Sequence, residues 1–370
     1  MNAPSASGLD GVVVAQTELS EVDGERGRLV IRGYFVEDLV ERATFEDVCG
    51  LMWNGAWPSP GEREALRALL SEARQQAFAL VSSLGWALKS TDSMEALRAA
   101  VGHLSTADQH ADRLRLTGAI PVFAAAWARE KLGQPVVPPL PGLSHAADYL
   151  QMLTGVLPEA PRVGALDAYL CCVVDHGMNA STFVARVVTS TGSDLVSAVV
   201  AAVGALKGPL HGGAPGPVLD MLDAIGHPQR ARAWLQAELA AGRRVMGMGH
   251  RIYRVRDPRA AALERAMSVL ERSEAVGERL ALARAVEREA ERLLTEWHPE
   301  RSLRANVEFY TAVLLDAIEV PRTLFAPTFA ASRVVGWCAH VDEQRRVGRL
   351  IRPASTYVGP APAANKAHLL

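Results

Sequence analysis

The 370-residue chain is poor in cysteine, and its four cysteines lack the spacing of a metal site. None belongs to a CxxC pair or stands at zinc-finger distance from a histidine, which argues against a bound zinc ion. We interpret all four as small buried hydrophobic residues in a protein of a reducing cytoplasm. These residues are Cys49, Cys171, Cys172 and Cys338.

The chain also lacks an excess of one charge and a long apolar run. Its 39 lysines and arginines against 41 acidic residues give a formal charge of −2, so no overall attraction for nucleic acid or membranes is expected. No apolar stretch approaches the roughly 18 residues of a membrane span. The N-terminal sequence MNAPSASGLDG has neither the basic nor the apolar region of a signal peptide. We therefore expect a cytoplasmic protein without a nucleic-acid or membrane partner.

The length favours two domains, because a single core rarely grows beyond about 250–300 residues. Hydrophobic residues make up 49% of the chain and charged residues 22%, which is ordinary for a folded globular protein. Strands do not alternate with helices, which counts against a doubly wound nucleotide-binding fold. Residues 12–35 hold two β-rich runs around the turn DGERG and predict a small hairpin or meander. The remainder predicts a mainly α-helical fold.

Several helix boundaries are predicted by capping residues. Thr44 followed by Asp47 opens an apolar-periodic stretch, and Ser93 stands at the N-cap position of a short helix. Asp257 and Pro258 are the residue types of an N-cap and a first helical position. The expected helices include residues 62–84, 112–132, 146–154, 165–176, 307–319 and 322–341.

Three separated stretches combine histidine or a carboxylate with sharply turning backbone. The first, from 175 to 216, contains DHGMNAST and GALKGPLHGGAPG; the second is VMGMGHRIYRVRDPRA; the third is ANVEFYTA. Glycine lets main-chain N–H groups approach a ligand, and a helical core does not need such motifs merely to pack. We predict that these stretches form one site and that the rest of the chain is its scaffold.

Charged residues in apolar surroundings indicate the chemistry of this site. Glu308 lies in an otherwise apolar stretch, so it must be paired, hydrogen-bonded or raised in pKa. Arg333 lies between small and apolar residues and also needs a partner. His211 and His250 stand beside glycines, which favours presentation to a ligand over the more common structural role of a lone histidine.

Two further residues allow two interpretations each. His176 follows Asp175, so it is either half of a buried hydrogen-bonded pair or a ligand group, and Arg259 is either a helix-terminal surface residue or a ligand group. Arginine binds carboxylates through two hydrogen bonds, while histidine and a carboxylate can share acid–base work. The residues alone therefore suggest proton removal next to a carbonyl, on an anionic substrate.

The sequence resembles the citrate synthase family along nearly its whole length. The resemblance rests on the three motifs above, together with GLDGVVVAQTELSEVDGERGRLVIRGY, MEALRAAV, FAASRVVGW and IRPASTYVGP. It implies a mainly α, two-domain helical fold with a small N-terminal β-hairpin. Residues 1–210 and 316–370, with a C-terminal arm, would form the large domain and residues 211–315 the small domain. The family closes its domain cleft over the substrates and works as a homodimer.

The resemblance also implies roles for single residues. His211 matches the histidine that stabilises the enol form of acetyl-CoA, and His250 matches the one that polarises and protonates the oxaloacetate carbonyl. Glu308 stands where the family has its catalytic base. The oxaloacetate ligands match His176, Arg259 and Arg333, and the arginine donated by the neighbouring subunit matches Arg352.

The same resemblance implies that acyl-CoA is a co-substrate and that no cofactor is permanently bound. Two arginines, Arg254 and Arg301, are weaker candidates for binding the CoA phosphates. The backbone that receives the adenine of CoA matches the loop formed by Val245, Met246, Gly247, Met248 and Gly249.

Three positions depart from the family pattern. Glu308 replaces the aspartate of NVDFY, Pro215 replaces the asparagine of HGGAN, and Gly177 replaces the glutamate of DHE. The longer side chain at 308 moves the carboxylate by on the order of 1 Å, a misplacement that can cost about a hundredfold in rate.

These departures keep several interpretations open. The leading one is condensation of acetyl-CoA with oxaloacetate, and propionyl-CoA as donor would give 2-methylcitrate instead. A different class of function is a paralogue that keeps the oxaloacetate pocket, condenses poorly and serves as a binding or regulatory subunit. A plain helical scaffold would leave the embedded charges unexplained.

Overall fold

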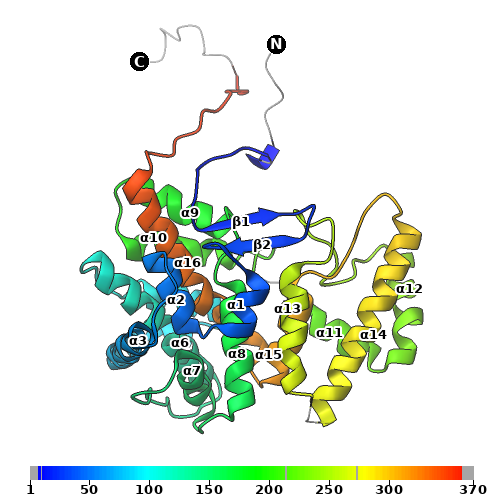
Figure 1. Cartoon of the computed structure of the whole chain (residues 1–370), viewed down its shortest axis with the longest axis horizontal. Helices are drawn as coiled ribbons and strands as arrows, with labels where there is room; N and C mark the ends of the chain where they lie inside the picture. The colour runs from blue at the N-terminus through cyan, green and yellow to red at the C-terminus, as the bar shows by residue number, and fades with distance from the viewer. Residues whose placement is uncertain (1–6, 10, 213–214, 272–273, 361–370) are drawn as a thin grey trace, which may run out of the picture.

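The computed structural model describes residues 7–9, 11–212, 215–271 and 274–360. The fold is mainly α-helical, with one small antiparallel sheet near the N-terminus, as predicted (Figure 1). Within the described ranges, no helix is long and apolar enough to cross a membrane.

The small sheet is a three-stranded meander, which confirms the β-rich start predicted from the sequence. Strands β1 (Ser20–Asp23), β2 (Arg28–Ile31) and β3 (Tyr34–Phe35) lie in that order. Ser20 pairs with Ile31 and Asp23 pairs with Arg28, so the predicted DGERG turn joins the first two strands. Figure 1 shows this turn extending across the molecule towards the loops that precede α13.

Long helices pack around α16, which is buried for most of its length. Because α16 is surrounded, it has no single apolar stripe, and its sequence carries small and charged residues among the large apolar ones. The helices of the N-terminal half are α1 (Val36–Arg42), α2 (Phe45–Asn54), α3 (Pro60–Leu80), α4 (Trp86–Lys89), α5 (Ser93–Val101), α6 (Gln109–Lys131), α7 (His145–Thr154), α8 (Ala160–Val173), α9 (Ala180–Ser190) and α10 (Leu195–Leu206).

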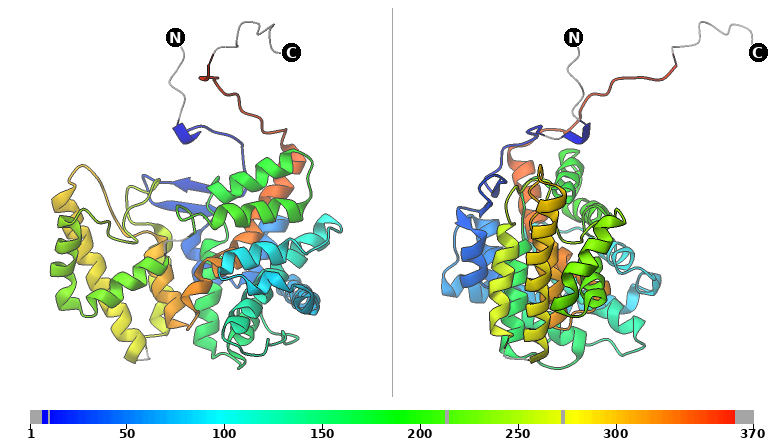
Figure 2. Two further views of the ribbon diagram at one scale, coloured as in Figure 1. Left: turned by 180° about the vertical axis from the view of Figure 1, so that it is seen from behind. Right: turned by 90° about the vertical axis from the view of Figure 1, so that its right-hand side faces the viewer.

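A second group of helices lies to one side of this bundle (Figures 1 and 2). Helix α12 packs on α14, and α15 contacts both α11 and α13. Helix α13 in turn packs against α1 and α8, so it joins the two groups. The division at residues 210 and 315 stays a prediction. The remaining helices are α11 (Pro215–Ile225), α12 (Ala231–Ala240), α13 (Pro258–Ala266), α14 (Glu274–Trp297), α15 (Val307–Ala317) and α16 (Phe325–Val347).

Two predicted helix caps are confirmed and one is wrong. Thr44 and Asp47 form a reciprocal capping box before α2, and Asp257 caps α13 ahead of Pro258. The N-cap of α5 is Asp92, whose carboxylate accepts the Glu95 N–H, so Ser93 is the first helical residue instead. Aspartate and serine are both good caps, and only the structure shows which one is used.

The predicted helix over 165–176 is also wrong at its end. Helix α8 stops at Val173, and Gly177 has a left-handed φ of 56° that no helix continues through. Asn179 then caps α9 by accepting the Thr182 N–H. The six-residue segment 174–179 is therefore an irregular turn, and it carries His176.

Helix α16 approaches this turn closely at Gly336. A Cβ atom on Gly336 would overlap the Val174 carbonyl oxygen and would also meet the Asp175 carboxylate. Gly336→Ala should therefore lower the melting temperature, since overpacking typically costs about 1–3 kcal/mol. Circular dichroism melts measure it, with Gly164→Ala as control because nothing lies within 4 Å of an added Cβ there. Equal melting of Gly336→Ala and the unaltered protein would contradict this packing.

Candidate active site

Four elements bring the predicted residues together. The turn after α8, the loop before α13, the start of α15 and the middle of α16 all meet, because α8 contacts α13, α15 and α16. The His176 and His250 rings lie 5.6 Å apart between centroids. Arg333 lies near enough to affect the pKa values of His176, His211 and Glu308. One cluster thus contains His176, His211, His250, Arg259, Glu308 and Arg333.

The glycines of the second motif hold the loop that leads to His250. Gly247 and Gly249 have left-handed φ values of 73° and 86°, and a Cβ on Gly247 would lie 2.9 Å from the Phe309 side chain. The loop pairs with the strand-like stretch before α15: Gly249 N donates to Arg304 O (2.7 Å) and Asn306 N donates to Gly247 O (2.9 Å). The same contacts therefore place His250 and Glu308.

His250 is held in one tautomer by its own loop. Its Nδ1 accepts the N–H groups of Ile252 (3.0 Å) and Tyr253 (3.1 Å). In the neutral ring the proton must then reside on Nε2, which is free to donate to a ligand. Burial, followed by the charge of Arg259, lowers the His250 pKa to about 4. The ring is therefore a neutral hydrogen-bond donor at physiological pH.

His211 is oriented by a serine that sequence analysis did not single out. Its Nε2 lies 2.8 Å from the Ser181 hydroxyl, which also accepts the Trp337 indole N–H (3.1 Å). Burial, with a further effect of Arg333, lowers the His211 pKa to about 4. Ser181 is the second residue of α9, and its place within the DHGMNAST motif is the one sequence feature that could have pointed to its role.

Glu308 is a partly buried residue in the first turn of α15. Its backbone N–H is taken by the Asn306 cap at 3.0 Å, while its carboxylate has no hydrogen bond to any described residue. Burial raises the Glu308 pKa to about 7, and the charges of Arg259 and Arg333 only partly oppose that rise. Of the three options that the sequence left open, the raised pKa is confirmed.

Arg333 is a buried cation with no ion-pair partner within 4 Å among the described residues. It is 1% exposed, and its Nε donates to Val173 O at 2.7 Å. Its two terminal nitrogens have no hydrogen-bond partner among the described residues. The guanidinium lies 4.5 Å from the Phe329 ring centre, and burial lowers its pKa to about 10. Two parallel unsatisfied N–H groups are the geometry that binds a carboxylate.

Arg259 is buried, so its interpretation as a surface residue is wrong. Asp257 binds it through Nε (3.0 Å) and Nη2 (2.7 Å). Asp257 also accepts the Val307 N–H at 3.2 Å, which ties the arginine to the first residue of α15. Only Nη1 of this guanidinium is without a hydrogen bond within the described ranges.

His176 is buried and contacts a tyrosine from the His250 loop. Its Nε2 lies 3.1 Å from the Tyr253 hydroxyl, and burial holds its pKa well below the usual value. The proposed pairing of His176 with Asp175 is wrong, because the Asp175 carboxylate binds His340 instead. Neither Tyr253 nor His340 was predicted, and each is brought to the site by the fold.

Comparison with known proteins agrees with this arrangement. A sequence description of the family named "Citrate synthase, C-terminal domain" matches residues 8–354. The chain belongs to the citrate synthase family. It is 39% identical to the citrate synthase of Haloferax volcanii, over 97% of each chain. It is 36% identical to the 2-methylcitrate synthase of Mycobacterium tuberculosis, over 95% of this chain and 90% of the relative.

Solved citrate synthase structures share the fold. The enzyme from Thermotoga maritima matches with a TM-score of 0.84 and 34% identity, over 97% of both chains. A ternary complex from Thermoplasma acidophilum, with carboxymethyl coenzyme A and oxaloacetate, matches with a TM-score of 0.87 and 27% identity, over 98% of both. The predicted family and fold class are thus confirmed, and members of this family are acyl-transferring enzymes.

The residues of this chain that were predicted to bind CoA lie at the edge of the cluster. Val245 and Gly247 are buried, while Met246, Met248 and Gly249 are partly exposed in the loop described above. Arg254 and Arg301 are exposed, and their side chains have no recorded partner in the described part of the chain. They are accessible to a ligand, and their role remains a prediction.

Arg352 does not join the cluster within one chain. It is exposed on the C-terminal arm and lines a cavity of about 520 Å³ with the N-terminal segment, including Val12 and Val14. Figure 2 shows both segments on the same side of the molecule. A role at an active site would therefore require a second subunit.

The remaining sequence predictions concern the departures and the cysteines. At Gly177 the left-handed φ explains glycine, because other residues rarely adopt it. The two residues before Pro215 lie outside the described ranges. All four cysteines are free and buried, which confirms their interpretation as buried residues, while the reducing cytoplasm stays a prediction. Among the described residues, no group of three or more His, Cys, Asp and Glu side chains could hold a metal ion.

We predict that His211 and His250 remain neutral between pH 5 and 8. Because their pKa values are about 4, the imidazolium form should appear only as the pH falls below about 5. NMR titration of the ring Cε1–H signals measures this, with His211→Gln and His250→Gln variants for assignment. A midpoint above pH 6 for either ring would contradict the site as described.

Proposed function

We propose that the protein condenses acetyl-CoA with oxaloacetate to give citrate and free CoA. The observation that carries the proposal is the presence, in one cluster, of a buried, unsatisfied cation and a carboxylate of raised pKa. Arg333 offers two N–H groups to an anion, and Glu308 near pKa 7 is a base poised at physiological pH.

The proposed proton transfers use three groups of the cluster. The Glu308 carboxylate removes a proton from the methyl group of acetyl-CoA, and His211 stabilises the enol that forms. The enol carbon attacks the keto carbon of oxaloacetate, and His250 Nε2–H donates to the oxygen that gains charge. Water then hydrolyses the thioester intermediate, which releases citrate and the CoA thiol.

Cationic side chains hold the substrate dianion in this scheme. Arg333 binds one carboxylate through its unpaired nitrogens, and Arg259 adds its free Nη1 while Asp257 keeps the rest in place. In a homodimer, Arg352 of the partner subunit would complete the pocket, which accounts for its distance from the cluster in one chain. A cytoplasmic location is part of the same proposal.

Two alternatives have specific support. The 36% identity to a 2-methylcitrate synthase supports propionyl-CoA as an alternative acyl donor, with Glu308 as the base in either case. Glu308 and Pro215 motivate a weakly condensing paralogue with a binding role. Against that paralogue, the three histidines and two arginines of the cluster that the resemblance assigns to the reaction are all present, and Glu308 keeps a carboxylate there.

The decisive experiment follows release of CoA thiol by the purified protein. We expect release that depends on oxaloacetate and is faster with acetyl-CoA than with propionyl-CoA. Glu308→Gln should slow it by at least about a hundredfold, because a general base is lost. Asp316→Asn, at the far end of α15, is the matched control and should leave the rate unchanged.

The Glu308→Asp variant separates an adapted site from a detuned one. The proposal predicts a lower rate, because the backbone here suits the longer glutamate and the carboxylate of aspartate would fall short of the substrate. A strong rise would show that the native site is detuned. No release with either donor, while oxaloacetate still binds, would contradict the proposal and support the paralogue.

A further inference from the structure

Strand β1 and the glycine that follows it touch two of the three segments that carry active-site histidines. Its first residue, Ser20, contacts the turn of residues 174–179, which carries His176. The glycine directly after its last residue, Gly24, contacts the loop that carries His250. One strand of four residues thus joins two segments that belong to different groups of helices.

Ser20 bridges the two residues that flank His176. Its hydroxyl donates to the Asp175 carboxylate and accepts the Gly177 N–H at 2.9 Å. A hydroxyl has one proton and two lone pairs, so it can satisfy both neighbours at once. Removing it would leave the buried Gly177 N–H without its partner, while the same Asp175 oxygen would keep only a 3.3 Å contact with His340.

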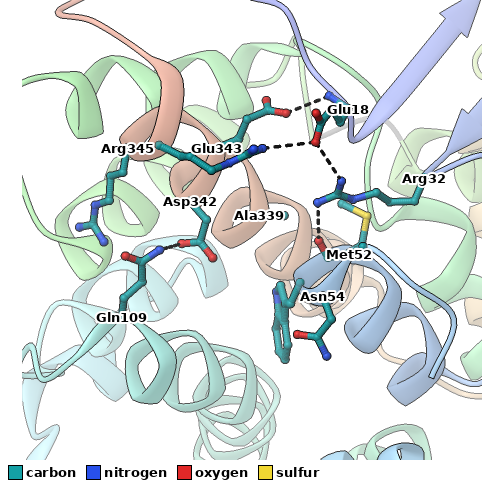
Figure 3. Close-up of a pocket in the computed structure, with 12 residues that line it drawn as sticks. Glu18, Arg32, Met52, Asn54, Gln109, Ala339, Asp342, Glu343 and Arg345 are labelled. Carbon is teal, nitrogen blue, oxygen red and sulfur yellow. Dashed lines mark hydrogen bonds and ion pairs between the residues drawn. The ribbon is translucent and has the colours of Figure 1, made fainter. Parts of the chain in front are cut away.

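A series of buried polar side chains holds the Asp175 carboxylate from its other side. His340 lies 3.1 Å from the second Asp175 oxygen, and Arg186 contacts the opposite ring nitrogen at 3.0 Å. Glu343 accepts from Arg186 at 2.6 Å and from the Glu18 backbone N–H at 2.8 Å. Figure 3 shows the Glu18–Glu343 contact at the wall of a cavity of about 740 Å³.

This series of contacts therefore ends at Glu18, just before β1. The strand is fixed to α16 at Glu18 and to the His176 turn at Ser20. These bonds are partly buried, and they tie the placement of β1 to that of the turn.

Gly24 fixes the backbone that orients His250. Its carbonyl accepts the Arg254 N–H at 2.9 Å, and a Cβ on Gly24 would overlap the Ile252 carbonyl. The N–H groups of Ile252 and Tyr253 are the donors that hold His250 Nδ1. Any side chain at Gly24 would displace that backbone and turn the imidazole away from its donor orientation.

We propose that β1 is a brace for the oxaloacetate pocket, in which Ser20 positions His176 and Gly24 positions His250. The proposal rests on the proposed function, because it assigns both histidines to oxaloacetate. The brace differs from a merely stabilising sheet in one respect: its loss should change oxaloacetate binding and the chemical step more than acyl-CoA binding.

Ser20→Ala tests the first contact. We expect the KM for oxaloacetate to rise roughly tenfold, the cost of one unsatisfied buried group, with the KM for acetyl-CoA nearly unchanged. Ser20→Thr keeps the hydroxyl and should restore most of the affinity. Ser71→Ala is the matched control, because the Ser71 hydroxyl also accepts a glycine N–H, that of Gly142.

Gly24→Ala tests the second contact. We expect kcat to fall about tenfold or more, since a displaced histidine no longer meets the reacting oxygen. Gly61→Ala is the control, because nothing lies within 4 Å of an added Cβ there. Hydrogen exchange of segments 174–179 and 250–256 should rise in the Ser20 and Gly24 variants, respectively.

The outcomes separate the brace from the proposed function. Unchanged oxaloacetate KM in Ser20→Ala, equal effects in Ser71→Ala, or no recovery in Ser20→Thr would overturn the brace. If the unaltered protein releases no CoA, the proposed function fails. In that case calorimetric binding of oxaloacetate, compared among the same variants, still decides whether β1 positions the pocket.

Discussion

The buried guanidinium of Arg333 is the constraint on which the site depends. A charge taken from water without a full set of partners is costly, and here two nitrogens have none among the described residues. The protein tolerates this because Val173 O, the Phe329 ring and the more distant Asp175 charge each stabilise part of the cation. The pocket is therefore assembled for an anion before one binds.

Burial produces the remaining chemistry in the same small volume. It keeps both histidines neutral, so His250 can donate a hydrogen bond from Nε2, and it raises the pKa of Glu308 to about 7. The three groups come from distant parts of the chain, yet the paired backbone of 247–249 and 304–306 fixes two of them together. Glycine at 247 and 249 is what permits that pairing.

Much of this site could be predicted from sequence, and the missing parts share one cause. His211, His250, Glu308 and Arg333 stand out because their local surroundings are unusual for their type. Tyr253 and His340 have no such local signal, and the Asp175–His340 contact spans 165 positions. The end of α8 was missed because the apolar run continues to Val174, although Asn179 was a readable cap for α9. Local patterns identify the chemical groups, and long-range packing decides which of them meet.

The central claim is that Arg333 is kept unpaired for a substrate carboxylate. Calorimetric binding of oxaloacetate to the unaltered protein and to Arg333→Gln, with melting curves of both free proteins, tests it most directly. We predict about a hundredfold weaker binding in the variant, because a charge-assisted carboxylate contact is lost. The melting temperature should not fall, since a costly buried charge is removed. Undiminished binding, or a marked loss of stability, would show that Arg333 serves the fold and not the substrate.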